Sequence, residues 1–117
     1  MAIEHAERLE SFVPLTSSDA LDDLFERSND RPVLLFKHSL TCPISSAAYD
    51  EMTKLSREVS LLVIQRSRGL SVEIERRTGV RHESPQVIIL RNGAAVWNGS
   101  HWTITADTVE RVAREND

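Results

Sequence analysis

The segment KHSLTCPISS, residues 37–46, holds the only cysteine of the chain, Cys42. Pro43 follows it directly, and proline is favoured at the first position of a helix. This junction therefore predicts that a helix begins just after the cysteine. A lone cysteine is often a small buried residue without chemistry. At a helix N-terminus, however, free N–H groups and the helix dipole stabilise a thiolate, so we interpret Cys42 as a nucleophile.

The residues around the cysteine include several groups that can stabilise a thiolate. The backbone N–H groups of Ile44, Ser45 and Ser46 are the predicted hydrogen-bond donors. Such a setting lowers the pKa of a cysteine from about 8.5 to about 3.5–7.5, and a shift of two units corresponds to about 2.7 kcal/mol. Lys37 and His38 are candidate cations that favour the thiolate, and His38 is also a candidate proton carrier. Alternatively, both are polar residues where a buried strand emerges.

The spacing Cys42-Pro43-Ile44-Ser45 places a serine where a dithiol oxidoreductase carries its second cysteine. Ser45 cannot form a disulfide. Its hydroxyl or N–H can bond the sulfur, or it is an ordinary serine of the first helical turn. Exchange must therefore pass through a mixed disulfide that an outside thiol resolves. A single cysteine also excludes an internal disulfide and favours a reducing, cytoplasmic compartment.

The segment RHESP, residues 81–85, supplies candidates for substrate binding. Pro85 opens an apolar run and is compatible with a cis bond after Ser84, although a trans bond is the default. Arg81 and His82 are candidate contacts for a carboxylate, or else solvated loop residues.

His101 and Trp102 follow the last predicted strand and are further candidates. Trp102 is either a wall of a small-thiol pocket or, more commonly for tryptophan, a partly buried packing residue.

The sequence lacks the residues that two other kinds of site require. A structural zinc site needs four ligands, and the one cysteine and four scattered histidines show no ligand spacing. A cysteine hydrolase needs a third group that orients its histidine, and no such pattern is visible.

Hydrophobic periodicity and turn signals predict the elements that position these residues. Strands are predicted at 11–15, 32–38 and 60–66, with a hairpin around Asn92-Gly93 within 85–100. The first lies at a sheet edge, since it contains a proline, and the run at 32–38 is buried and central. Helices are predicted at 16–30, 43–59, 71–79 and 105–117. The predicted caps are Thr16, Ser17 or Ser18 for the first helix and Thr105 for the last, with Gly79 ending the third.

Composition sets the limits of the function. The chain has 117 residues and a net charge of −4, which favours one domain and argues against nucleic acid as a partner. The apolar runs are too short to span a bilayer, and the acidic, polar start is no targeting segment, so no membrane partner is expected. We predict an N-terminal arm at residues 1–10 and one domain at residues 11–117.

The predicted order β-α-β-α-β-α-β-β-α is that of a thioredoxin-like fold, an α/β architecture of three layers around a mixed sheet. The segment TGVRHESPQVIILRNG (78–93) resembles the thioredoxin segment that carries a cis proline and its hairpin. The segments FKHSLTCPIS (36–45) and SHWTIT (100–105) resemble the monothiol bacilliredoxins of the bacillithiol system. The resemblance extends over nearly the whole chain after the first ten residues.

This resemblance implies that Cys42 attacks protein–bacillithiol mixed disulfides, takes the bacillithiol onto itself and is released by another thiol. Pro85 would be the cis proline beside the sulfur, and the residue before it would offer its backbone to an extended substrate. The partners would be bacillithiolated proteins and bacillithiol itself, a co-substrate rather than a cofactor. A basic pocket for the malate group of bacillithiol would draw on Lys37, His38, Arg81 or His82.

Two departures from ordinary thioredoxins favour a monothiol exchanger: Ser45 replaces the second cysteine, and Phe36 replaces the buried acid. The Cys-Gly-Phe-Ser stretch of iron–sulfur-carrying monothiol glutaredoxins is absent from the sequence. The second hypothesis is a non-catalytic thioredoxin-like binding or adaptor domain, with Cys42 as a redox-sensing residue. The acidity of the Cys42 thiol distinguishes the thiol–disulfide exchanger from the adaptor domain.

Overall fold

The computed structural model describes residues 12–117, in which nine regular elements and one short 3₁₀ helix follow one another. They are β1 (Phe12–Pro14), α2 (Ser18–Arg27), β2 (Val33–His38), α3 (Pro43–Met52), β3 (Val59–Val63), α4 (Arg68–Thr78), β4 (Gln86–Arg91), β5 (Ala94–Ser100), η1 (His101–Thr103) and α5 (Ala106–Glu115). This is the predicted order β-α-β-α-β-α-β-β-α. The predicted arm at residues 1–10 lies outside the described residues, so the domain boundary remains a prediction.

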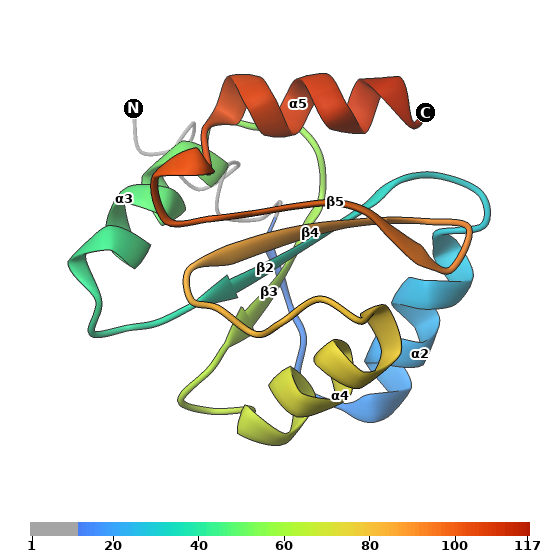
Figure 1. Cartoon of the computed structure of the whole chain (residues 1–117), viewed down its shortest axis with the longest axis horizontal. Coiled ribbons are helices and arrows are strands. Elements are labelled where there is room, and N and C mark those ends of the chain that lie inside the picture. The colour runs from blue at the N-terminus through green and yellow to red at the C-terminus, as the bar shows by residue number, and fades with distance from the viewer. Residues whose placement is uncertain (1–11) are drawn as a thin grey trace.

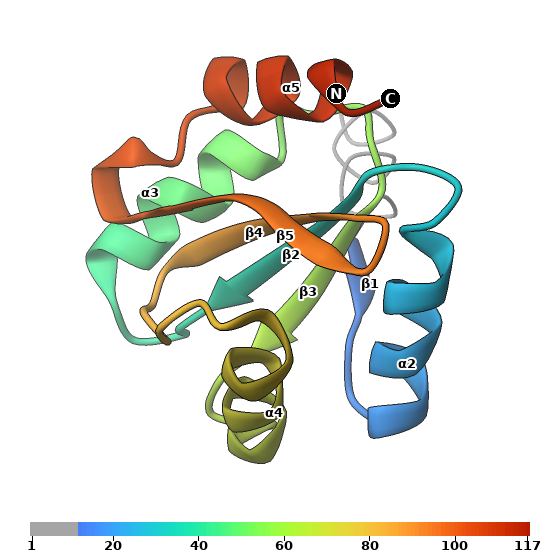
Figure 2. The ribbon, with the colours of Figure 1, turned by 45° about the vertical axis from the view of Figure 1, so that its right-hand side comes forward.

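The five strands form one mixed sheet in the order β1-β3-β2-β4-β5. Strands β1, β3 and β2 are parallel, whereas β4 is antiparallel to both β2 and β5. Strand β1 lies at an edge and β2 at the centre, as predicted. Helices α3 and α5 cover one face of the sheet, and α2 and α4 cover the other (Figures 1 and 2). The expected three-layer α/β architecture is thus confirmed.

Side chains of β2 alternate between two hydrophobic clusters, because successive residues of a strand point to opposite faces. Leu34 and Phe36 pack in the cluster that includes residues of α3 and α5. Val33 and Leu35 pack in the cluster that includes residues of α2 and α4. The same alternation directs the next residue, Lys37, toward α4 and the last one, His38, toward α3. Their placement on opposite faces decides what each can do at the site.

Helix α3 is shorter than predicted, since it ends at Met52 rather than at residue 59. Leu55 is buried and lies three positions beyond Met52, so its spacing imitates a continuing helix. The backbone N–H groups of Lys54 and Leu55, however, donate to the carbonyls three residues before them, at 3.1 and 3.3 Å. This tighter turn stops the helix and leads the chain into β3.

Helix α4 begins at Arg68, earlier than the predicted residue 71, and the preceding strand ends at Val63 rather than at residue 66. Gly69 lowers helix propensity, which explains why the first turn was not predicted. The burial of Leu70 anchors that turn against the sheet.

Several turn and cap predictions are confirmed. Ser17 caps α2 by accepting from the Ala20 N–H, and Thr105 caps α5 by accepting from the Thr108 N–H. The hairpin turns at Asn92-Gly93, whose φ angles of 55° and 78° are the positive values that such a turn requires. In the part of the chain that the structure describes, no helix is long and apolar enough to cross a membrane.

Candidate functional site

One end of the sheet brings together the segments that carry the candidate residues. Lys37 of β2 pairs with Gln86 of β4, which pairs with Ser100 of β5. The end of β2, the start of β4 and the end of β5 therefore meet at the same end of the sheet, on the left of Figure 1. The loop from β2 into α3 starts at this end, and η1 packs against α3. Residues far apart in the sequence thus surround the first turn of α3.

Cys42 is the N-cap residue of α3, in extended backbone conformation, and Pro43 takes the first helical position. The cysteine is a free thiol of intermediate exposure, so reagents can reach it. Its side chain makes no capping hydrogen bond. The Ser46 N–H donates to the Cys42 carbonyl at 3.1 Å and is therefore committed to the helix. Of the three predicted donors, those of Ile44 and Ser45 remain, as first-turn N–H groups without an intrahelical partner.

Ser45 is fully buried and bonds the end of β2 rather than the cysteine. Its Oγ accepts a hydrogen bond from the Ser39 N–H at 2.9 Å and lies 2.8 Å from His38 Nδ1. The hydroxyl has two acceptor lone pairs and one proton, so it can accept from the Ser39 N–H and still share a hydrogen bond with His38 Nδ1, whose direction depends on the His38 tautomer. Burial is the main influence on His38, and it lowers the pKa of the imidazole. Burial thus favours the neutral form of the ring, and the hydrogen bond of the ring with Ser45 joins the end of β2 to the first turn of α3.

His38 also stacks with aromatic rings under α3. Its ring centroid lies 5.0 Å from that of Tyr49 and 5.6 Å from that of Phe36. Burial raises the pKa of the Tyr49 phenol, and the charge of Asp50 raises it further. The cluster fixes α3 on the sheet through neutral groups.

Lys37 lies on the other face, and its side chain is fully buried. Its Nζ is 3.2 Å from His82 Nδ1. Burial lowers the pKa of Lys37 to about 8, although the charges of Glu75 and Glu83 act to raise it. Burial also lowers the pKa of His82, as does the Lys37 charge. The Lys37 charge therefore disfavours a positive charge on His82.

The predicted cationic residues do not gather into one pocket. His82 lines a cavity beside α4, whereas His38 lines a different cavity beside α3. Arg81 is exposed, and its carbonyl accepts a hydrogen bond from Gln86 Nε2 at 3.0 Å. The sequence did not show which side of the sheet Lys37 and His38 would each face, because strand β2, which carries both, is buried on both faces.

The Ser84–Pro85 peptide bond is cis. Pro85 is buried, and its carbonyl accepts from the His101 N–H at 3.1 Å, which joins the start of β4 to η1. The Ser84 Oγ is buried and has no hydrogen-bond partner among residues 12–117. Pro85 and His101 thus lie together at the sheet end from which α3 is reached.

Trp102 is 71% exposed, so the packing role that is common for tryptophan is wrong here. It lies in η1, whose entry is fixed by reciprocal hydrogen bonds between Ser100 and Thr103. Leu40, which precedes the cysteine by two residues, is 53% exposed and was not predicted as part of the site. The sequence did carry a signal for Leu40, because it is an apolar residue within a polar loop. Leu40 and Trp102 place apolar surface on the loop and the turn that adjoin α3.

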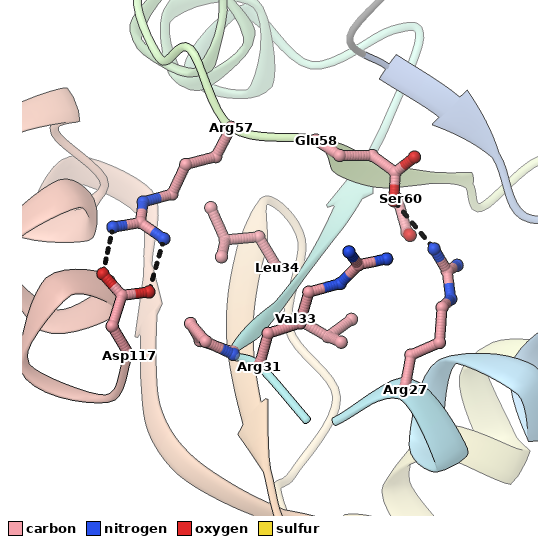
Figure 3. A pocket seen from close by; sticks show the side chains of 9 residues that line it. Arg27, Arg31, Val33, Leu34, Arg57, Glu58, Ser60 and Asp117 are labelled. Carbon is pink, nitrogen blue, oxygen red and sulfur yellow. Dashed lines mark hydrogen bonds and ion pairs between the residues drawn. The ribbon is translucent and has the colours of Figure 1, made fainter. Parts of the chain in front are cut away.

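A separate hollow lies at the opposite end of the sheet, around the start of β2 (Figure 3). Arg27 donates to Glu58 at 2.9 Å, and Arg57 makes two hydrogen bonds with Asp117 at 3.0 and 3.1 Å. Because both guanidinium groups already hold carboxylates, we interpret this region as a structural ion-pair network.

Comparisons with known proteins identify the family and the fold. Residues 13–109 match the family model of the monothiol bacilliredoxin BrxC. A solved structure described as a candidate oxidoreductase with a thioredoxin fold is 34% identical, with a TM-score of 0.81 over 89% of this chain and 95% of that chain.

Two thioredoxins show the fold alone. The Fasciola hepatica protein is 10% identical, with a TM-score of 0.70 over 90% of this chain and 99% of its own. A mutant thioredoxin from Halobacterium salinarum NRC-1 is 14% identical, with a TM-score of 0.67 over 90% of this chain and 89% of its own. Together with the family match, the shared fold makes this chain a thioredoxin-like redox protein that belongs to the monothiol bacilliredoxin family.

Proposed function

We propose that this chain is a monothiol thiol–disulfide exchanger that removes bacillithiol from protein mixed disulfides. The observation that carries the proposal is the position of Cys42. It is a partly exposed free thiol at the N-cap of α3, and a buried serine occupies the place of a resolving cysteine. The family match supports bacillithiol as the small thiol.

The exchange needs two balanced steps. In the first, the Cys42 thiolate attacks the bacillithiol sulfur of a mixed disulfide. A Cys42–bacillithiol disulfide forms, the original S–S bond breaks, and the protein thiolate leaves. In the second, another bacillithiol thiolate attacks the Cys42-bound adduct. A new disulfide forms between the two small thiols, and the Cys42 thiolate is regenerated. Each step exchanges one disulfide for another, so no further oxidant or cofactor is required.

The site can assist both steps through fixed groups. The N–H groups of Ile44 and Ser45 point from the first turn of α3, where they and the helix dipole favour a thiolate, whether attacking or leaving. Ser45 holds this turn against β2 through its bonds to His38 and Ser39. The loop at Ser84 and Pro85 supplies backbone for an extended substrate, in the strand-addition mode.

The test is the mass of the intact chain after incubation with oxidised bacillithiol. We expect a single adduct, mapped to Cys42 by peptide digestion and reversed by added free thiol. The Cys42→Ala variant should show neither the adduct nor the release of bacillithiol from a modified model protein. Alkylation by iodoacetamide at a pH near 6 should be fast for this chain compared with a small model thiol.

The opposite outcomes favour the adaptor hypothesis. Slow alkylation at that pH and no adduct would mean that Cys42 is an ordinary thiol. A Cys42→Ala variant that still cleared bacillithiol from the model protein would place the activity elsewhere and overturn the proposal.

A further inference from the structure

A cavity of about 350 Å³ lies beside α3, and the predicted basic pocket did not include most of its lining. Apolar side chains of β3 form one part of the lining. Its polar part comes from His38, Ser46, Tyr49, Asp50 and Arg66. The volume is within the range of small-molecule pockets, which run from about 300 to 1,000 Å³.

The cavity lining includes a residue of the first turns of α3, the helix that Cys42 caps. Ser46, which lines it, follows Cys42 by four positions and donates its N–H to the Cys42 carbonyl. Residues with this spacing are neighbours on one face of a helix, with Cβ atoms about 5–6 Å apart. A small molecule whose sulfur is joined to Cys42 can therefore place its remaining atoms in this cavity.

The two flanks of the cysteine differ. Strand β3 lies on one side of β2, and β4 lies on the other. The cavity is on the β3 side, whereas Pro85 directly precedes β4 and Trp102 follows β5. A mixed disulfide joins a protein to a small thiol. The β3 side and the β4 side of the cysteine differ, so each half of the disulfide can bind on a different side.

The lining is suited to a molecule with carboxylates and hydroxyls. Arg66 is exposed and makes no ion pair with any residue in the range 12–117. His38 also lines the cavity, and its Nδ1 is hydrogen-bonded to Ser45, which leaves Nε2 as the ring nitrogen available to a ligand. Tyr49 adds a hydroxyl, and Asp50 is the one carboxylate that opposes an anion in this lining.

We infer that this cavity is the subsite for the non-sulfur part of an anionic low-molecular-weight thiol, with Arg66 pairing with its carboxylate. The protein half of the mixed disulfide then lies on the flank of Pro85 and Trp102. This inference rests on the proposed function, since it assumes that Cys42 exchanges with such a thiol.

The test compares two disulfides, oxidised bacillithiol and a neutral hydroxyalkyl disulfide. The quantity measured is the ratio of their rate constants for adduct formation at Cys42. Arg66→Gln should lower this ratio about 1.5- to 5-fold, as expected for the loss of one solvent-accessible ion pair. Asp50→Asn should raise it, because it removes the opposing charge. Arg68→Gln is the matched control, an exposed arginine two residues away that lines a different cavity, and should leave the ratio unchanged.

Added salt provides a second readout, because it screens exposed charges. The ratio should fall with salt in the unmodified chain and fall much less in Arg66→Gln. If adducts form but Arg66→Gln and Asp50→Asn leave the ratio unchanged, the subsite is wrong while the proposed function stands. If neither disulfide reacts with the unmodified chain, the proposed function itself fails.

Discussion

At the scale of single residues, Ser45 cannot resolve a disulfide but still positions the turn that carries Cys42. It stands where a resolving cysteine would be, yet it is buried and bonds the backbone of Ser39 and the ring of His38. It therefore positions the turn that carries Cys42 instead of reacting.

Replacing Ser45 by alanine should destabilise the fold. The Ser39 N–H and His38 Nδ1 would both lose their partner in a buried place, which costs about 1–3 kcal/mol in the free energy of unfolding. Denaturant unfolding followed by circular dichroism measures this change. Ser46→Ala is the control, since Ser46 is exposed and should change stability by less than about 0.5 kcal/mol. Equal effects of the two substitutions would contradict the structural role of Ser45.

Lys37 predicts a pH dependence of stability. Its pKa in the folded chain is about 8, below the ordinary value of 10.5, so the unfolded chain binds more protons between these two pH values. The contribution of Lys37 to the free energy of unfolding therefore increases as the pH rises from about 8 to about 10.5. Below this pH window the buried ammonium destabilises the fold by a constant amount.

Lys37→Met should remove this slope. A buried apolar side chain of similar size avoids the desolvation of the charge, so the variant should match or exceed the stability of the unmodified chain near neutral pH. The measurement is the difference in unfolding free energy between the two chains across the window, because other titrating groups contribute to each. A difference that stays constant with pH would show that Lys37 keeps its ordinary pKa when folded.

At the scale of elements, the sequence predicted types and order well and predicted ends and faces poorly. The start of α3 was predictable, because Pro43 favours the first position of a helix. Its end was not, because the buried Leu55 continues the helical spacing beyond the turn. Which of the two faces each of Lys37 and His38 would take was also hidden, since a strand buried on both sides shows no alternation of polar and apolar residues. The Ser45–His38 bond depends on how α3 docks on β2, which no local pattern encodes.

Gly99 links β5 to η1 through a close approach. A Cβ at this position would overlap the ring of Trp97 and come within 3.0 Å of Thr103 Oγ1. Gly99→Ala should thus displace the tryptophan and disturb the bonds that fix the entry to η1, at a cost of about 1–3 kcal/mol.

Gly69→Ala is the matched control for this substitution. An added Cβ at Gly69 meets nothing within 4 Å, and the residue lies in the first turn of α4. Alanine there should stabilise the chain by up to about 1 kcal/mol. Thermal unfolding of both variants, with the fluorescence of Trp97 and Trp102 as a local probe, gives the two signs. Stabilisation by Gly99→Ala would contradict the close packing of β5 on η1.

At the scale of the whole molecule, the two ends of the sheet have different tasks. At one end, Arg57 bonds Glu110 and Asp117 and fastens α5 to the segment before β3. At the other end, α3, η1 and the loop at Pro85 leave the thiol partly exposed. With one cysteine in the chain, every disulfide that the chain forms is either an adduct with another thiol or a link between two chains.

Ser45→Cys should change this outcome, because it restores two cysteines at helical spacing in Cys-Pro-Ile-Cys. Positions 42 and 45 are neighbours on the helix surface, so an internal disulfide can close faster than a bond between chains. Oxidation of the variant should therefore give a monomer that is lighter by two hydrogens, whereas the unmodified chain gives a linked pair or an adduct. Non-reducing electrophoresis with intact mass measurement separates these products.

The doubly substituted chain Cys42→Ala with Ser45→Cys is the control for this prediction, since it keeps one thiol in the buried position. It should form an adduct more slowly than the unmodified chain, because Ser45 is fully buried whereas Cys42 is partly exposed. Linked pairs from Ser45→Cys, with one free thiol per chain, would show that the first turn of α3 cannot close a disulfide. The monothiol chemistry would then be fixed by the geometry of this turn as well as by the serine.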